Sequence, residues 1–458
     1  MNDTSRAVVI GGSIAGLATA ATLSTRVGEV VLVERRTPPR DGSIAPQGAL
    51  PHVMLAAGAV VLERLFPGFA TALLAGGAES GGDDPQRLPC HWAAAGSVRD
   101  HLSLPDTGVP RALCSRALVE QTLRRTTLAL PNVRCVPAGV VGLAISGSGR
   151  DATVTGVRLR GRGDLEAELV VDASGRATKS PQWLRDRGLE PPRTTEVVVD
   201  LRYSGYLVER LPGDVHGAAV VVAQNSADVP RIGVALPREG GCWQVVLGGY
   251  FGDAAPVDGA GAVGFARSLS DPTLAELVSR PLLAEPARYT FRSSLWRRWD
   301  KVRRLPRGLC AVGDAVASFN PLYGQGMTSA LLQAEALGSA YDRHGLDRDL
   351  GRAHARAAAR IVANPWTTAT GSDFIYPRTV GRRPPASTAV NRYVEQVTRA
   401  AAVDELVNRA FTEVQQLLAP PAGLFAPRVA AHVWSHRAAL TGRGQDAAAE
   451  AQVRASID

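Results

Sequence analysis

A glycine-rich turn near the start of the chain carries the first chemical signal. Residues 7–10 form a short apolar run, the turn from Gly11 to Gly16 follows, and an alanine-rich segment comes next. A second apolar run ends at Glu34, about 20 positions beyond the turn, which is the spacing of a ribose-binding acid in dinucleotide sites. Backbone N–H groups of such a turn, at the positive end of a helix, can hold a pyrophosphate. The pattern predicts a dinucleotide site whose acid would repel a 2′-phosphate.

A second glycine-rich turn lies late in the chain. Residues 309–312 are apolar and lead into Gly313 and Asp314, so the acid sits where a parallel strand would end. Pro321 and the sequence GQGM at 324–327 follow, directly before an apolar helix. Open α/β sheets bind ligands at the carboxyl ends of their strands, and a glycine-rich turn at a helix start is a seat for negative charge. Asp172, in the sequence DASGR, is a further acid at the end of a predicted strand.

The elements that must position these residues are those of an α/β protein with a β-rich part. A βαβ unit opens the chain, and an amphipathic helix is expected at 115–128. Arg116 lies in the first turn of that helix, where a cation opposes the helix dipole and hints at another partner. Regularly spaced β-rich segments at 196–206, 218–222, 231–236 and 243–250 predict an antiparallel sheet that could cover a pocket. The tail beyond residue 341 is predicted to be helical and to form a packing layer.

Composition places the chain among ordinary globular proteins. Its 458 residues, 45% of them hydrophobic, suffice for two or three domains. The net charge of +8 rests on 51 basic residues, of which only Lys179 and Lys301 are lysines. The arginines are scattered and form no basic stripe with interleaved aromatic residues. A nucleic-acid partner is therefore not expected.

Cysteine usage and hydropathy indicate in which cellular compartment the protein is expected. The five cysteines are odd in number and have neither C-x-x-C spacing nor a paired histidine motif, which argues for a reducing compartment and against a structural metal site. The N-terminus has no signal pattern, and no apolar run approaches the roughly 20 residues needed to cross a bilayer. We expect a soluble cytoplasmic protein with no metal and no membrane span.

Together, the early turn, the DASGR loop and the late GD…P…GQG loop resemble the motifs of the flavoprotein monooxygenase superfamily. These are the single-component (group A) FAD enzymes with a hydroxybenzoate-hydroxylase-like fold. The resemblance implies an α/β fold in which a Rossmann-like FAD-binding domain carries an inserted mixed or antiparallel β-sheet substrate domain and a helical C-terminal tail. The implied boundaries are 1–180 for the first part of the FAD-binding domain with an insertion around 76–110, 181–285 for the β-rich substrate domain, 286–345 for the second part with the flavin loop, and 346–458 for the helical C-terminal region.

The resemblance also implies which residues bind a non-covalent FAD. The early turn would seat the pyrophosphate, Glu34 would hold the adenosine ribose, Asp314 would bind a ribityl hydroxyl, and the loop 321–327 would lie against the isoalloxazine ring. The implied set is Gly11, Gly12, Ser13, Ala15, Gly16, Glu34, Arg35, Arg116, Val140, Asp172, Gly313, Asp314, Pro321, Gly324, Gln325, Gly326 and Met327. Ser13 stands in this chain where the motif has its middle glycine. Pro321 would also position the flavin and the substrate.

Within the superfamily the chain resembles most the bacterial polyether-antibiotic FAD epoxidases. The sequences that carry this resemblance are Pro46-Gln47 with His52 and Gly58, GDAVASFNPLYGQGM, Tyr376-Pro377 and Val407-Asn408-Arg409. The chain departs from those enzymes at Ala49 and Leu50, where they carry arginine and histidine. It also has Ala317 where aromatic hydroxylases have a histidine, and Thr328 in place of the last residue of G-x-G-x-N.

The activity that this resemblance implies is oxygenation. A flavin C4a-hydroperoxide, formed from O2 with NAD(P)H as a transient reductant, would insert one oxygen atom into a hydrophobic, polyketide-like natural product, and alkene epoxidation is expected. Epoxidation needs no side-chain base, whereas hydroxylation of a phenol profits from one. His52, His91 and His101 are isolated in the sequence, and His52 is the one histidine expected in the pocket.

Other activities of this scaffold remain open at this point. Aromatic or phenolic hydroxylation, reduction of polyprenyl double bonds, and a non-enzymatic flavin-binding scaffold are the alternatives. A halogenase is not expected, because no lysine precedes Lys179 and because Trp296 and Trp299 have W-x-x-W spacing. The sequence is compatible with a monomer or a homodimer, and with a partner flavin reductase as the source of electrons.

Overall fold

The structure is a computed structural model, and it describes residues 5–36, 48 and 50–436. Its first layer is a parallel five-stranded sheet in the order β15-β9-β1-β2-β5. The strands are β1 (Arg6–Ile10), β2 (Glu29–Glu34), β5 (Val133–Pro137), β9 (Leu169–Asp172) and β15 (Leu309–Ala311). This order brings the end of β1 beside the ends of β9 and β2, since Ile10 pairs with both Asp172 and Val33. The two glycine-rich turns therefore leave the sheet at the same edge.

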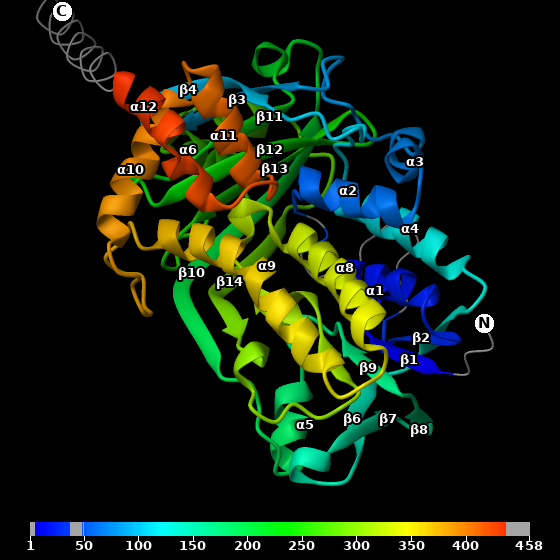
Figure 1. The fold of residues 1–458 in the computed structure, drawn as a ribbon. Helices are drawn as coiled ribbons and strands as arrows, with labels where there is room; N and C mark the ends of the chain where they lie inside the picture. The colour runs from blue at the N-terminus through cyan, green and yellow to red at the C-terminus, as the bar shows by residue number, and fades with distance from the viewer. Residues whose placement is uncertain (1–4, 37–47, 49, 437–458) are drawn as a thin grey trace, which may run out of the picture.

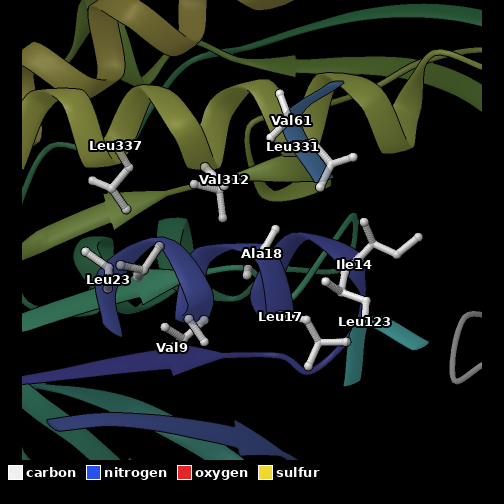
Figure 2. Close-up of a cluster of buried hydrophobic side chains, with 14 of the residues drawn as sticks. Val9, Ile14, Leu17, Ala18, Leu23, Val61, Leu123, Val312, Leu331 and Leu337 are labelled. Carbon is white, nitrogen blue, oxygen red and sulfur yellow. The ribbon is translucent and has the colours of Figure 1, made fainter. Parts of the chain in front are cut away.

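The strands of this sheet are apolar throughout because both faces are covered, as in other parallel sheets. Ala7 and Val9 of β1 belong to one hydrophobic cluster, whereas Val8 and Ile10 belong to another. One face is covered by α1 (Ile14–Ser24), which packs between β1 and α8 (Gly326–His344). Figure 2 shows Leu17 and Ala18 of α1 between Val9 of the sheet and Leu331 of α8. The helices α1 and α8, which follow the early and the late glycine-rich turn, thus pack in the same hydrophobic core.

The second layer is a mixed eight-stranded sheet in the order β16-β14-β10-β13-β12-β11-β3-β4. Its strands are β3 (Arg87–Ala94), β4 (Ser97–Ser103), β10 (Thr194–Glu209), β11 (Val220–Ala223), β12 (Arg231–Arg238), β13 (Cys242–Gly249), β14 (Ala287–Arg297) and β16 (Ala317–Ser318). Every neighbouring pair is antiparallel except β3 and β11, which are parallel. The expected α/β fold with an inserted mixed sheet is confirmed.

Two parts of the chain outside the expected substrate domain, 181–285, contribute strands to this sheet. The insertion around 76–110 supplies β3 and β4 to the large sheet, although they lie far from its other strands in the sequence. β14 falls in the expected second FAD-binding part, 286–345, yet it pairs with β10 along most of its length. The reason in both cases is backbone pairing between distant strands, which local sequence patterns do not reveal.

The segment 133–146 is divided between two sheets. β5 joins the parallel sheet beside β2, and β6 (Val140–Ser146) starts a separate three-stranded sheet with β7 (Thr153–Leu159) and β8 (Gly163–Glu166). Shorter helices cover these layers: α2 (Ala56–Leu65), α3 (Phe69–Ala75), α4 (Arg116–Leu128), α5 (Ser180–Asp186), α6 (Gly259–Arg267) and α7 (Leu274–Val278). α4 confirms the helix expected at 115–128.

The C-terminal part is helical, as predicted. Its helices are α9 (Leu350–Asp373), α10 (Ser387–Ala400), α11 (Glu405–Gln415) and α12 (Pro427–Ser435). α9 packs along α8, whereas α11 contacts β4 of the large sheet (Figure 1). Within the described ranges no single helix is long and apolar enough to cross a membrane; α2 and α3 pass that test only as a pair bent by 104°. The tail thus spans both layers of the molecule.

Candidate flavin site

One cavity of about 810 Å³ connects the two glycine-rich turns with the large sheet. Its lining comes from the turn after β1, the loop 314–327, the face of the large sheet and the helices α10 and α11. The apolar residues of the wall include Leu88, Leu102, Leu113, Val220, Val222, Ile232, Val234, Leu236, Val246, Val394 and Phe411. A cavity of this size and polarity is suited to an organic ligand.

The first turn requires its glycines for backbone reasons. Gly11 has φ +104°, and a Cβ there would lie 2.6 Å from the carbonyl oxygen of Ala173. A Cβ on Gly16 would lie 1.7 Å from the carbonyl oxygen of Gly11, so only glycine lets α1 start this close to the strand. Gly11, Gly12, Ser13 and Ala15 line the cavity, whereas Gly16 packs behind them.

Glu34 lies at the end of β2 in the wall of the cavity, as its position in the sequence suggested. Its Oε2 accepts a 2.7 Å hydrogen bond from the N–H of Gly12, and its Oε1 accepts one of 2.8 Å from the N–H of Arg36. Arg35 lines the same part of the wall. The carboxylate is thus fixed against the turn, in a position to meet a ligand there.

Arg116 reaches from α4 to the same turn. Its Nη2 donates to the hydroxyl of Ser13 and to Oε1 of Glu120, both at 3.1 Å, and the Ser13 hydroxyl itself donates to Glu120. Because a cation in the first turn of a helix opposes the helix dipole, Arg116 was expected to have another partner. Ser13 and Glu120 are partners of this kind. A pyrophosphate at Ser13 would require the hydroxyl to exchange Glu120 for a phosphate oxygen.

Four of the implied residues do not line the cavity, although the structure describes all of them: Gly16, Val140, Asp172 and Gly313. Asp172 is fully buried and accepts hydrogen bonds from Ser174 and Thr178, so it shapes the DASGR loop. The loop itself, from Ala173 to Ala177, does line the cavity. Val140 begins β6, outside both large sheets. Gly313 donates its N–H to Gln333 Oε1 at 3.0 Å, inside the helix–sheet core.

Asp314 lies in the cavity wall among three arginines. Burial raises the pKa of its carboxyl group, and the positive charges of Arg116, Arg176 and Arg297 oppose that rise. Arg297, on β14, donates to the carbonyl oxygen of Asp314 at 3.0 Å and to that of Arg176 at 2.6 Å. One buried side chain therefore ties the late loop to the DASGR loop.

The late loop turns tightly against the segment around residue 53. The side chain of Asn320 caps the turn Pro321–Tyr323 by accepting a 3.2 Å hydrogen bond from the N–H of Leu322. Gly324 has φ +63°, and a Cβ there would lie 2.6 Å from Cγ1 of Val53. Pro321, Gly324, Gln325, Gly326 and Met327 all line the cavity, and α8 begins at Gly326. The amide end of α8 thus faces the ligand space.

His52 lies in the cavity wall, and its surroundings make it a weak base. Its Nδ1 lies 2.8 Å from the carbonyl oxygen of Leu50, and because a carbonyl only accepts, Nδ1 carries the proton. Burial, reinforced by the charge of Arg116, lowers the pKa of His52 to about 3. The ring is therefore neutral at ordinary pH. The neighbouring Pro46, Gln47 and Ala49 lie outside the described residues.

Sequence reasoning missed a buried carboxyl group behind the late loop. Asp373, the last residue of α9, is 0% exposed; its Oδ1 accepts from Asn320 Nδ2 at 2.8 Å, and its Oδ2 has no hydrogen-bond partner within the described part of the chain. Burial raises the pKa of Asp373 to about 7, against the hydrogen bonds from Asn320 and Tyr250. No motif marks this aspartate, because the turn and the helix that bring it together with Asn320 are 53 residues apart.

Four buried or half-buried tyrosines lie within electrostatic reach of this carboxyl group, and the hydroxyl of Tyr250 contacts it at 3.5 Å. Tyr203, Tyr250, Tyr323 and Tyr376 are each influenced by the charge of Asp373, and burial raises the pKa of each. Tyr203 and Tyr323 line the cavity, as does Asn320. The cluster thus joins a buried acid to the ligand space through neutral hydrogen-bonding groups.

Comparison with known proteins places the chain in a family. Protein Rv3254 of Mycobacterium tuberculosis is 32% identical over 456 residues, an alignment that covers 94% of each chain. The chain belongs to the same family as Protein Rv3254. No protein-family model matches the sequence.

Solved structures similar to this family member establish its fold. A flavoprotein/dehydrogenase from Cytophaga hutchinsonii superposes with a TM-score of 0.63 at 16% identity, over 90% of this chain and 92% of that one. A mutant form of 2-methyl-3-hydroxypyridine-5-carboxylic acid oxygenase superposes with a TM-score of 0.61 at 18% identity, over 86% of this chain and 93% of that one. At such identities the likeness concerns the arrangement of elements.

The residues of this family member that line the cavity fit a flavin adenine dinucleotide. The wall runs without interruption from the dinucleotide-type turn and Glu34 to the loop 321–327, and Arg116 and Arg176 place positive charge between them. Oε1 of Gln325 is buried without a partner within the described ranges. Within those ranges, no cluster of three or more histidine, cysteine or acidic residues could hold a metal ion.

Proposed function

We propose that this protein is a single-component FAD-dependent monooxygenase that inserts one oxygen atom from O2 into a hydrophobic natural-product substrate, with NAD(P)H as the electron donor. The observation that carries the proposal is the single cavity, in which a dinucleotide-type turn, a glycine-rich loop at a helix start and an apolar wall are continuous. The fold shared with a flavoprotein and an oxygenase supports it.

In this proposal each part of the cavity has a task. The turn at Gly11 to Ser13 and the guanidinium group of Arg116 would hold the pyrophosphate, and Glu34 would bind the adenosine ribose. Asp314 would accept a hydrogen bond from the ribityl chain. Pro321 and the residues 324–327 would support the isoalloxazine ring. Val140 and Asp172, which the resemblance also implied, would act from outside the cavity wall.

The chain's own contribution to the reaction would be electrostatic and steric. Bound FAD would supply the redox centre that activates O2. The N–H groups at the start of α8, from Gly326 onward, would stabilise negative charge on the ring, because the amide end of a helix carries partial positive charge. The apolar wall would exclude water and hold an apolar substrate against the ring.

The finer proposal is epoxidation of an alkene. Most of the side chains that the large sheet contributes to the wall are aliphatic, and His52 is held neutral. Neither feature supplies a base in direct contact with a substrate, and an alkene needs none.

Hydroxylation of a phenol is the second candidate, and one observation favours it. The Asp373 carboxyl group, whose pKa is raised to about 7, is connected by Asn320 and Tyr250 to tyrosines in the cavity wall. Such a chain of hydrogen bonds could take a proton from an acidic hydroxyl group.

The proposal is tested with purified full-length protein. We expect it to be yellow, to bind FAD stoichiometrically, and to transfer one atom of ¹⁸O from labelled O2 to product when supplied with NADH or NADPH and candidate polyenes or phenols. An epoxide product would support the first candidate and a hydroxylated ring the second. Turnover without O2 would instead support a reductase, and bound flavin that neither nicotinamide nor an added flavin reductase can reduce would contradict an enzyme.

A further inference from the structure

A buried arginine lies at the end of the cavity formed by β3, β4 and α11. Arg99, on β4, is 4% exposed. Its guanidinium group donates to three neutral oxygens: Oε1 of Gln415 at 3.1 Å, and Oδ1 of Asn408 and Oγ1 of Thr412, both at 3.4 Å. It forms no ion pair within residues 5–36, 48 and 50–436, and no carboxyl group influences its pKa; the only ionisable neighbour that does so is the Cys90 thiol. The guanidinium is thus a buried cation without a counter-ion.

Such a cation needs an explanation, because burying an unpaired charge is costly and buried charges are normally paired. Burial lowers the pKa of Arg99 to about 10, so the group still carries its charge at ordinary pH. Two aromatic rings offset part of the cost: Cζ of Arg99 lies 4.9 Å from the ring centroid of Trp92 and 5.4 Å from that of Phe411. Rings and neutral oxygens reduce the penalty but leave the net charge in place.

The charge lies directly behind the cavity wall. Trp92, Phe411 and Gln415, which all contact Arg99, line the cavity. Figure 1 shows β3, β4 and α11 at one end of the molecule, away from α1 and its glycine-rich turn. In an apolar cavity a charge acts over several ångströms with little screening. This end of the cavity is therefore electropositive.

Two side-chain amides present donors at the same end. Oε1 of Gln415 accepts from Arg99 at 3.1 Å, and Oε1 of Gln224 accepts from the indole N–H of Trp92 at 3.1 Å. Guanidinium and indole groups only donate, so both amide orientations are fixed with the oxygens turned to these partners. Each Nε2 therefore points elsewhere, and within the described part of the chain neither has a hydrogen-bond partner. Gln224 and Gln415 both line the cavity.

We propose that this end of the cavity, formed by Trp92, Gln224 and Gln415 in front of Arg99, binds an anionic oxygen of the substrate. The substrate is then an apolar molecule that bears a carboxylate or an ionised enol or phenol. Its negative charge supplies the counter-ion that Arg99 lacks, and the two amide nitrogens donate to the anionic oxygen. The inference rests on the proposed function, because it assigns the substrate class of the same cavity.

The test uses the flavin-loaded full chain and two probes with the same ring system, 2-naphthoate and its neutral methyl ester. Isothermal titration calorimetry on the wild type should give at least about tenfold tighter binding of the anion, as for a charge-assisted pair. Arg99→Met, which keeps the aliphatic stem, should bring the two affinities together. Arg87→Met is the matched control, because Arg87 lies on the adjacent strand β3 with its side chain 55% exposed; this variant should keep the preference.

A second variant tests the missing counter-ion without any ligand. Gln415→Glu places a carboxylate where Arg99 already donates, so it should raise the midpoint of thermal unfolding and abolish the preference for the anion. Gln415→Leu should lower that midpoint. Equal affinities for the two probes, no binding of 2-naphthoate, or a preference that survives both Arg99→Met and Gln415→Glu would overturn the proposal.

These outcomes are separable from the proposed function. Flavin absorbance and ¹⁸O incorporation report on the flavin end of the cavity, whereas the ratio of the two affinities reports on the Arg99 end. A protein that prefers the anion but transfers no oxygen would retain this binding site and lose the monooxygenase assignment. A protein that oxygenates a neutral substrate and binds the two probes equally well would retain the monooxygenase assignment and lose the anion-binding site.

Discussion

Several single residues around the cavity have surroundings that leave little room for another residue type. Gly16 is the clearest case, since a Cβ would lie 1.7 Å from the carbonyl oxygen of Gly11. Asp314 differs, because its carboxyl group is held by charge: three arginines oppose the rise in its pKa that burial causes. Residues of the first kind shape the site, and residues of the second kind are suited to meet a ligand.

Asp314→Ala should weaken retention of FAD. Removing the carboxyl group deletes the acceptor proposed for the ribityl chain, and loss of a charge-assisted hydrogen bond costs about 1.5–3 kcal/mol, or roughly tenfold or more in the dissociation constant. Flavin occupancy after gel filtration, measured from the absorbance spectrum, checks this. Asp164→Ala on the exposed hairpin strand β8 is the control. Unchanged occupancy in Asp314→Ala would contradict the placement of the loop.

Asp373 should make the protein less stable as pH rises. Its pKa is about 7 in the folded state and near 3.8 in the unfolded chain, so between these values the folded state holds a proton that the unfolded state has lost. Stability attributable to this group is present below about pH 4, declines through the window, and is absent above about pH 7. The difference amounts to up to about 4 kcal/mol, since one pKa unit corresponds to about 1.36 kcal/mol.

Asp373→Asn removes that dependence. The free energy of unfolding of the wild type should fall between about pH 5 and about pH 8 by the contribution of Asp373, whereas that of the variant should not. The difference between the two proteins should therefore shift in favour of the variant, as measured by urea titration at both pH values. Asp164→Asn should show no such gain. Parallel pH profiles for wild type and Asp373→Asn would mean that the carboxyl group of Asp373 titrates normally.

At the scale of elements, the two sheets are joined where β14 passes the strand-end loops. Arg297 is 8% exposed and donates to the carbonyl oxygens of Arg176 and Asp314, which follow β9 and β15. The large sheet thereby holds both loops of the parallel sheet in place. β16, at residues 317–318, adds backbone pairing to β14 at the same point.

Arg297→Met should loosen both loops together. Two buried carbonyl groups lose a charged donor, at a cost of about 1–3 kcal/mol each, so we expect a lower thermal midpoint and weaker flavin retention in the same variant. Differential scanning fluorimetry with and without added FAD measures both effects. Arg292→Met, at an exposed position of the same strand, should change neither. A loss of stability with full flavin retention would show that the loops are held by other contacts.

Prediction from the sequence succeeded for elements whose information is local. The turn at Gly11, Glu34 at the end of β2, and the start of α8 within the GQGM sequence follow from spacing within some 20 residues. Arg99 and Asp373 were not identified, because their significance lies in partners hundreds or tens of residues away, such as Gln415 and Asn320. His52 was placed in the cavity, but its neutral state depends on burial and on Arg116, which spacing does not reveal.

At the scale of the whole molecule, the cavity lies between layers that share it. The parallel sheet, the large sheet and the C-terminal helices each supply part of the wall. A ligand that fills this space contacts all three, so its binding energy is distributed over the entire fold.

Binding of FAD should therefore raise the unfolding midpoint of the whole chain as one transition. A ligand bound only to the folded state stabilises it by about 2.7 kcal/mol at a free concentration of 100 times its dissociation constant. Calorimetry of flavin-free and flavin-loaded protein, with tryptophan fluorescence and far-ultraviolet circular dichroism as independent probes, measures this shift. Two separate transitions, of which only one moves with flavin, would contradict a shared site.

The strand order β15-β9-β1-β2-β5 also constrains synthesis on the ribosome. β1 leaves the exit tunnel first and can pair early with β2, yet its other neighbour β9 ends at residue 172 and the edge strand β15 begins at residue 309. The glycine-rich loop that completes the cavity follows later still. The parallel sheet therefore stays incomplete while about 300 further residues are translated, which at about 5–20 residues per second takes some tens of seconds. Binding of a cofactor in this cavity would thus be a late, nearly post-translational event, and until β15 is made β9 has no strand on its other side.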